Sequence, residues 1–229
     1  MRSVLSEGSA VPPIVFFVDS ANRADAERWL RTGVATGVTT NPTILRRAGA
    51  RASDIPLIHA WATDAGAREV CFQTWGSSAE EWYANAMRIR EWAPDATVKV
   101  PCTEAGAGVI RRLHAQDVPV LMTAVYAAKQ ALVGSALGVR YLAPYFDRLR
   151  RTGRDAVAEF ARMTTVIPQD GSGPLVMAAS LKSANDVLTL AEVGVRVFTA
   201  APEVLADVFD QALTEQAVEA FERDMLDVL

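Results

Sequence analysis

The sequence predicts an α/β protein built as a single parallel (β/α)₈ barrel, and three observations support this fold class. Eight short apolar runs alternate with longer amphipathic runs along the 229 residues. The short runs are continuously apolar, as expected for strands that are covered on both faces. A polar or reactive side chain stands at or near the end of each run. The ends of TIM-barrel strands ring one mouth, whereas those of an open sheet lie along a line, so the barrel explains the pattern better.

The expected strands are rich in valine, isoleucine, leucine and phenylalanine. They cover residues 14–19, 37–41, 69–73, 97–101, 118–123, 139–145, 174–180 and 195–200. The polar residues at or near their ends are Asp19, Asn41, Gln73, Lys99, Thr123, Tyr145, Ser180 and Thr199. Successive members of this set are separated by roughly one β/α unit, so we expect them to meet at the barrel mouth.

Amphipathic runs between the strands predict the surrounding helices. Residues 78–92 open with Ser78 and Glu81 at the spacing of a capping box and continue with one apolar face. Residues 183–194 have the same character and end at a glycine, a common helix stop. The final segment, 213–229, is also amphipathic. It is either the last barrel helix or an extension beyond the barrel.

We expect residues 14–229 to form the barrel with a C-terminal helical extension, and residues 1–13 to be an N-terminal extension. Half of the residues are hydrophobic, which is enough for one substantial core. No low-complexity segment or linker divides the chain. The stretch 168–173, "PQDGSG", predicts a loop before the seventh strand.

Composition excludes several classes of partner. The net charge is −4, so no basic excess points to a nucleic acid. No apolar run approaches the roughly eighteen residues that would predict a membrane span. The two cysteines, Cys71 and Cys102, form neither a metal-ligand pattern nor a disulfide framework, and the N-terminus lacks the apolar run of a signal peptide. A cytoplasmic protein without a metal site is the expectation.

Lys99 stands in the middle of an apolar strand, "TVKVP". Side chains of a barrel strand alternate between the surrounding helices and the interior, so Val98 and Val100 face the helices and Lys99 points inward. Burial disfavours the ammonium form, and a neutral amine can attack a ketone to form a Schiff base, whose cation is an electron sink. Alternatively, the stem packs inside while the ammonium pairs with Asp19 or reaches water. Position alone favours neither interpretation.

The neighbouring strand ends also have structural explanations. Asp19 taken alone is better explained as a helix N-cap than as a catalytic acid that orients Lys99 or moves a proton. Asn41 precedes a proline, and this pair is typical of the first turn of a helix. Gln73 and Thr123 are suited to holding a water molecule at adjacent strand ends.

Further residues extend the expected mouth. Tyr145 is either a surface aromatic or a proton donor. Arg148 and Ser180 lie where barrels often bind phosphate. Each of these residues has a structural interpretation at least as good as its functional one. Their joint arrangement around Lys99 is what predicts a site.

Six segments resemble the transaldolase family, and most of all its fructose-6-phosphate aldolase branch. They are "FFVDS", "GVTTNPTI", "VKVPCTEAG", "TAVYAAKQAL", "YLAPYFDRL" and "AASLKSANDVL", in family order over about residues 14–225. The resemblance implies a (β/α)₈ barrel and a class I aldol mechanism that needs no metal or organic cofactor. It also implies a sugar or sugar phosphate as the substrate. The C-terminal segment resembles one that reaches a neighbouring subunit, which implies a homo-oligomer, a pentamer or decamer.

The resemblance assigns roles residue by residue. Lys99 is the Schiff-base lysine, Asp19 a proton-transfer or orienting acid, and Asn41 a ligand of substrate hydroxyls. The residues that handle the catalytic water and protons are Gln73, Thr123 and Tyr145. The phosphate-binding positions are Arg148 and Ser180, with Lys182 in the adjoining motif.

Three positions separate the branches of the family. Dedicated transaldolases have glutamate, phenylalanine and arginine where this chain has Gln73, Tyr145 and Lys182. The resemblance therefore favours an aldolase that cleaves or forms the C3–C4 bond of a ketose such as fructose 6-phosphate. The alternatives are a transaldolase that transfers a dihydroxyacetone unit and a non-catalytic barrel that binds a sugar phosphate. Asp147, an acid beside Arg148, departs from the family pattern and weakens the expectation of a phosphorylated substrate.

Overall fold

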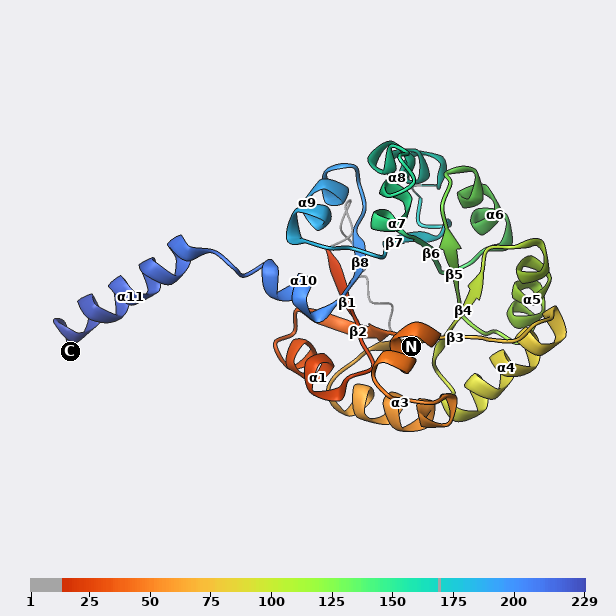
Figure 1. Ribbon diagram of the computed structural model, residues 1–229, viewed down its shortest axis with the longest axis horizontal. Coiled ribbons are helices and arrows are strands. Elements are labelled where there is room, and N and C mark those ends of the chain that lie inside the picture. The colour runs from red at the N-terminus through yellow and green to blue at the C-terminus, as the bar shows by residue number, and fades with distance from the viewer. Residues whose placement is uncertain (1–13, 169) are drawn as a thin grey trace.

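The structure is a computed structural model that describes residues 14–168 and 170–229. Eight parallel strands close a barrel in chain order, and helices surround it (Figure 1). The predicted (β/α)₈ fold is confirmed. The expected N-terminal extension, residues 1–13, lies outside the described residues.

The barrel strands are short, and they lie close to the predicted apolar runs. They are Val15–Asp19 (β1), Ala35–Thr39 (β2), Glu69–Gln73 (β3), Thr97–Pro101 (β4), Val120–Val125 (β5), Tyr141–Pro144 (β6), Leu175–Ala178 (β7) and Val197–Ala200 (β8). β2 starts and ends two residues earlier than expected, because Asn41 belongs to the start of the next helix.

The helices alternate with the strands, in places as pairs. They are Arg23–Arg31 (α1), Pro42–Arg47 (α2), the 3₁₀ turn Ala52–Asp54 (η1), Ile55–Asp64 (α3), Ala79–Trp92 (α4), Glu104–His114 (α5), Lys129–Leu137 (α6), Phe146–Arg150 (α7), Ala156–Val166 (α8), Ala184–Glu192 (α9), Pro202–Asp207 (α10) and Ala212–Leu226 (α11). Most helices begin at a capping side chain. Ser78, for example, accepts a hydrogen bond from the backbone N–H of Glu81, as predicted, whereas the Glu81 carboxylate accepts from Ser77 and so does not complete the predicted capping box.

Apolar side chains form two layers, one between the strands and helices and one inside the barrel. Val98 and Val100 are fully buried in the outer layer, so Lys99 between them faces inward as predicted. The interior layer is small. It contains Val15, Phe17, Cys71, Leu121, Tyr141, Ala143, Met177 and Val197.

Gly37 on β2 makes room for this interior packing. A Cβ atom at this position would lie 2.4 Å from the ring of Phe17 and 2.6 Å from the carbonyl oxygen of Glu69. The absence of a side chain therefore lets the Phe17 ring fill the lower interior.

The N-terminal end of the barrel holds a buried polar cluster around Glu69, the first residue of β3. One carboxylate oxygen accepts a hydrogen bond from Thr97 Oγ1, and Oε2 accepts one from Tyr141 Oη at 2.8 Å. Arg140 Nη2 lies 3.2 Å from the same oxygen, Oε2. Burial, with the negative charge of Glu69 beside them, raises the pKa values of Tyr141 and Cys71.

The C-terminal segment is an extension beyond the barrel. α10 follows β8, and the ring of Phe209 then stacks on Trp29 of α1, with centroids 5.9 Å apart. α11 projects away from the barrel (Figure 1). None of the helices described here combines the length and the apolar character that a membrane crossing requires.

Candidate active site

A cavity of about 290 Å³ opens at the C-terminal ends of the strands. It brings together residues from most of the strand ends, as the predicted convergence requires. The expected site residues that line it are Asp19, Asn41, Lys99, Tyr145, Arg148, Ser180 and Lys182.

Lys99 extends into this cavity from the middle of β4. Its backbone pairs with Gln73 on β3 and with Leu121 on β5. Only 4% of its surface is exposed, and what remains accessible lines the cavity. The side chain is therefore shielded from bulk water and open to a substrate, as an amine nucleophile requires.

Asp19 ends β1 and is held from inside the barrel. Its Oδ1 accepts a hydrogen bond of 2.6 Å from Thr39 Oγ1, whose own oxygen lies 2.5 Å from Thr199 Oγ1. The interpretation of Asp19 as a helix N-cap is wrong, because Asn22 caps α1 by accepting from the N–H of Asp25. The chain leaves the strand for three residues before the helix begins.

The surroundings of Asp19 disfavour the ionised form of its carboxyl group. Burial raises its pKa, against the opposing effects of the positive charge of Lys99, the hydrogen bond from Thr39 and the charge of Arg148. A carboxyl group with a raised pKa beside a cavity is a candidate for proton transfer.

The position of Asn41 is compatible with both expected roles, as a helix cap and as a ligand of the substrate. Its Oδ1 accepts a 3.0 Å hydrogen bond from the N–H of Ile44 and so caps α2, with Pro42 in the first turn. The residue also lines the cavity. Because the cap uses the carbonyl oxygen, the amide NH₂ is left to donate to a substrate oxygen.

Tyr145 is fixed by contacts on several sides. Its hydroxyl lies 2.8 Å from Thr123 Oγ1, and its ring meets the edge of Tyr126 at 5.6 Å. The guanidinium of Arg148 lies 4.7 Å from the ring centroid. Thr123, which is almost completely buried, therefore reaches the site through Tyr145. β5 changes register directly after it, where Ala124 has a φ of 57°.

Gln73 opens mainly to a second depression. It lies opposite Lys99 in the strand register. However, it lines an adjacent apolar groove of about 500 Å³ together with Pro42, Leu45 and Trp75. Gln73 therefore does not line the cavity that contains Lys99, and the predicted convergence of the strand ends does not extend to it.

Cations predominate around the cavity mouth. Arg148 and Ser180 lie there as predicted, and Ser180 has a left-handed φ of 60° just beyond β7. Sequence reasoning missed Arg47 and Arg151, which line the same cavity. Helical spacing could have identified both residues. Arg47 lies on the helix that Asn41 caps, and Arg151 follows Arg148 by about one helical turn.

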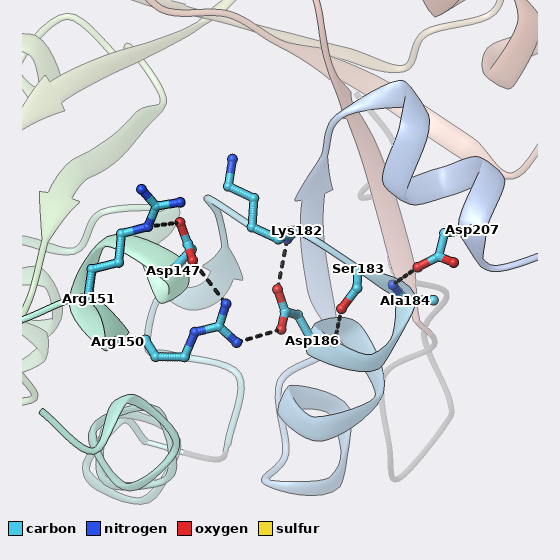
Figure 2. Close-up of polar contacts among 8 residues, drawn as sticks. All are labelled: Asp147, Arg150, Arg151, Lys182, Ser183, Ala184, Asp186 and Asp207. Carbon is cyan, nitrogen blue, oxygen red and sulfur yellow. Dashed lines mark hydrogen bonds and ion pairs between the residues drawn. The ribbon is translucent and has the colours of Figure 1, made fainter. Parts of the chain in front are cut away.

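Asp147 is bound to other arginines than its sequence neighbour Arg148. It is 4% exposed; its Oδ1 pairs with Arg150 Nη2 at 3.0 Å, and its Oδ2 pairs with Arg151 Nε at 2.8 Å (Figure 2). These partners follow from the spacing of three and four residues along one helical turn. Arg148 instead lies over Tyr145 at the cavity.

Within residues 14–168 and 170–229, no group of three or more histidine, cysteine, aspartate or glutamate side chains is arranged to hold a metal ion. The two cysteines are free thiols, and Cys102 accepts a hydrogen bond from Gln130 at 3.3 Å.

Residues 16–228 match the sequence pattern of the family described as Transaldolase/Fructose-6-phosphate aldolase. The chain belongs to this family. Two proteins named "Probable transaldolase", from Streptococcus agalactiae serotypes V and III, are each 28% identical to it over 209 residues. Each alignment covers 91% of this chain and 96% of the relative.

Solved structures support the fold alone. A thiamine phosphate pyrophosphorylase from Pyrococcus furiosus superposes with a TM-score of 0.60 at 11% identity, covering 82% of this chain and 85% of the other. A mandelate oxidase variant superposes with a TM-score of 0.58 at 13% identity, covering 88% of this chain and 70% of the other. The functional argument for this family member therefore depends on its own cavity.

Proposed function

We propose that the chain is a class I aldolase that cleaves or forms the C3–C4 bond of a ketose through a Schiff base. Fructose 6-phosphate, yielding dihydroxyacetone and glyceraldehyde 3-phosphate, is the type of substrate proposed. The observation that carries the proposal is the buried amine of Lys99 at a cavity that also presents the carboxyl of Asp19 and the side chain of Tyr145. This set supplies a nucleophile and two proton-transfer groups.

The first half of the reaction forms the Schiff base. The nitrogen of Lys99 attacks C2 of the ketose, and the carbonyl oxygen gains a proton to become a hydroxyl group. This hydroxyl leaves as water, with Tyr145 supplying a proton. The 2.8 Å contact between Thr123 Oγ1 and the hydroxyl of Tyr145 supports a role for Thr123 in orienting the phenol. Gln73, which lies opposite Lys99 in the strand register, is proposed to hold a water molecule. The product is an iminium ion at C2.

The second half breaks the carbon–carbon bond. Tyr145 or Asp19 takes the proton of the C4 hydroxyl, and C4 becomes the carbonyl carbon of the leaving aldehyde. The electron pair of the C3–C4 bond moves towards the iminium and forms an enamine on Lys99. Protonation of C3 and hydrolysis then release dihydroxyacetone and regenerate the amine. Asn41 is suited to hold a substrate hydroxyl during these steps.

The fate of the enamine separates the aldolase from the alternative transaldolase. A hydroxyl group at position 145 can protonate the enamine, so that the fragment is released to water. The relatives named "Probable transaldolase" favour transfer to an acceptor sugar phosphate instead. We expect dihydroxyacetone to appear from fructose 6-phosphate without any added acceptor. Release only after an acceptor is added would support the transaldolase.

Borohydride trapping tests the covalent step. The chain is incubated with dihydroxyacetone or fructose 6-phosphate, reduced, digested and analysed by mass spectrometry. The three lysines, Lys99, Lys129 and Lys182, lie far apart in the sequence, so the modified peptide is assigned without ambiguity. We expect an adduct on Lys99 that Lys99→Met abolishes and that the matched control Lys129→Met retains. Binding without an adduct would support a non-catalytic sugar-phosphate barrel.

We also propose that the chain assembles into a ring-type homo-oligomer, a pentamer or decamer. α11 carries large apolar side chains in the open, including Leu213 at 71% and Phe221 at 68% exposure. Such a face is typical of an interface. Sedimentation velocity is expected to show an oligomer that Phe221→Asp dissociates. A monomeric wild-type chain would rule this assembly out.

A further inference from the structure

An ionic brace of three residues spans the side of the cavity mouth. Arg150, which ends α7, lies between Asp147 of its own helix and Asp186 in the first turn of α9 (Figure 2). Its Nη2 pairs with Asp147 Oδ1 at 3.0 Å, and its Nη1 with Asp186 Oδ1 at 3.3 Å. Both carboxylates are only 4% exposed. Buried carboxylates are expensive without partners, so these ion pairs fix the two helix ends relative to each other.

Asp186 also holds the chain between β7 and α9. Its Oδ2 accepts a 2.7 Å hydrogen bond from the backbone N–H of Lys182, and its own N–H donates to Ser183 Oγ at 3.2 Å. Two residues on from Lys182, the N–H of Ala184 donates to Asp207 Oδ2 at 2.6 Å (Figure 2). The backbone that carries Lys182 is thus fixed, while its ammonium group remains outside the brace.

The guanidinium group of Arg151 is bound on one side only, at Nε. Its Nε pairs with Asp147 Oδ2 at 2.8 Å. Figure 2 shows the terminal nitrogens of Arg151 and the ammonium of Lys182 pointing to the same side, away from the Asp147–Arg150–Asp186 brace. Both residues line the cavity.

Charge at this side of the mouth is divided between the brace and the cavity. The negative charges of Asp147 and Asp186 are balanced by the positive charges of Arg150 and Arg151. Arg47, Arg148 and Lys182 also line the cavity and add to the positive side. A local excess of positive charge thus remains in a chain whose net charge is −4.

We propose that Arg151 is an anion-binding residue of the cavity, and that Asp147, Arg150 and Asp186 position it and Lys182 to hold the phosphate of a substrate. This inference rests on the proposed aldolase function and names further determinants of substrate choice at the same site. The pair with the buried Asp147 restrains an Arg151 side chain that is otherwise 72% exposed, which lowers the entropy lost when phosphate binds. Asp147, which looks unfavourable for phosphate in the sequence, instead supports phosphate binding by pre-organising the arginine.

Paired acceptors test the proposal. Aldol addition of dihydroxyacetone to glyceraldehyde 3-phosphate is compared with addition to unphosphorylated glyceraldehyde. The readout is the ratio of the two kcat/KM values. We expect Arg151→Gln to lower this ratio about tenfold, mainly through a higher KM for the phosphorylated acceptor, because a charge-assisted hydrogen bond is lost. Asp147→Asn is expected to lower the ratio severalfold in the same way, with partial recovery in Asp147→Glu.

Arg154→Gln is the matched control, because Arg154 follows on the same loop but pairs with Glu159 at 2.9 Å. It should leave the ratio unchanged. A ratio in Arg151→Gln equal to that of the wild type would overturn the proposal. So would an equal loss on both acceptors in Asp147→Asn, which would assign Asp147 a purely structural role.

Direct binding separates this proposal from the aldolase proposal. Titration with inorganic phosphate, followed by calorimetry, does not depend on turnover. We expect Arg151→Gln to bind phosphate about tenfold more weakly than the wild type and the Arg154→Gln control. If no aldol reaction occurs but this difference is found, the anion site stands and the aldolase proposal fails. If turnover occurs but phosphate affinity is equal in all three proteins, the anion site fails alone.

Discussion

The barrel interior holds one carboxylate near each of its ends, and the surroundings of these two groups differ. At the N-terminal end, Glu69 is bound by a threonine, a tyrosine and an arginine. At the C-terminal end, Asp19 accepts a hydrogen bond from Thr39 and faces an open cavity. The same strand geometry positions both groups.

The difference separates a structural cluster from a reactive one. The partners of Glu69 all come from the protein, so its burial is compensated when the chain folds. Burial of Asp19 is compensated incompletely, and the remaining cost appears as a raised pKa. We infer that the cluster around Glu69, at the N-terminal or lower end of the barrel, contributes to stability. The cluster around Asp19, at the C-terminal or upper end, is less stable and more reactive, as is common at active sites.

The largest effect on stability is expected from Glu69→Ala. The substitution leaves the hydroxyl groups of Thr97 and Tyr141 without their acceptor and Arg140 without its anion. We expect the free energy of unfolding to fall by about 3–5 kcal/mol, measured by urea denaturation. The matched change at the upper end, Asp19→Ala, should cost much less. Equal losses at the two ends would contradict the division between them.

Two tyrosines sharpen the same comparison. Tyr145→Phe removes the hydroxyl beside Thr123 at the cavity and is expected to lower kcat for dihydroxyacetone release by about 10²-fold, with little change in Tm. Tyr141→Phe removes a donor to Glu69 and is expected to cost about 1–3 kcal/mol of stability, with kcat retained. Both changes delete one oxygen. If both variants lost mainly activity, or both mainly stability, the contrast between the two ends would be wrong.

Local pattern determined how much of this arrangement could be predicted. The strands were predictable because continuous apolar runs mark buried parallel strands, and strand alternation gave the direction of Lys99. The N-cap role proposed for Asp19 was wrong because its loop runs on to Asn22, and only the tertiary structure fixes such a loop length.

Residues that pair across elements could not be predicted. Arg150 reaches Asp186 over 36 positions, and Tyr141 reaches Glu69 over 72, because helix and strand packing brings them together. Glu69 was not predicted because it is the first residue of its strand, whereas the site was predicted from residues at the C-terminal ends of the strands. Gln73 faces the groove because of the position of α2, and the sequence of β3 does not indicate that position.

The smallest predicted effect is a pH dependence of stability at the upper end. The pKa of Asp19 is raised in the folded chain above its ordinary value of 3.8, so the native state holds the proton more tightly than the unfolded state does. Below the unfolded value both states are protonated and ionisation costs nothing. As pH rises through the folded pKa, the native carboxyl ionises inside the protein and stability is lost.

Asp19→Asn removes this titration. We expect the free energy of unfolding of the variant minus that of the wild type to rise with pH above the unfolded pKa and to level off above the folded pKa. Urea denaturation at a series of pH values measures this difference, and Asp64→Asn on the exposed end of α3 serves as the control for replacing an aspartate by asparagine. A difference that falls with pH would mean that attraction to Lys99 outweighs burial, and Asp19 would then resemble Glu69 as a satisfied carboxylate.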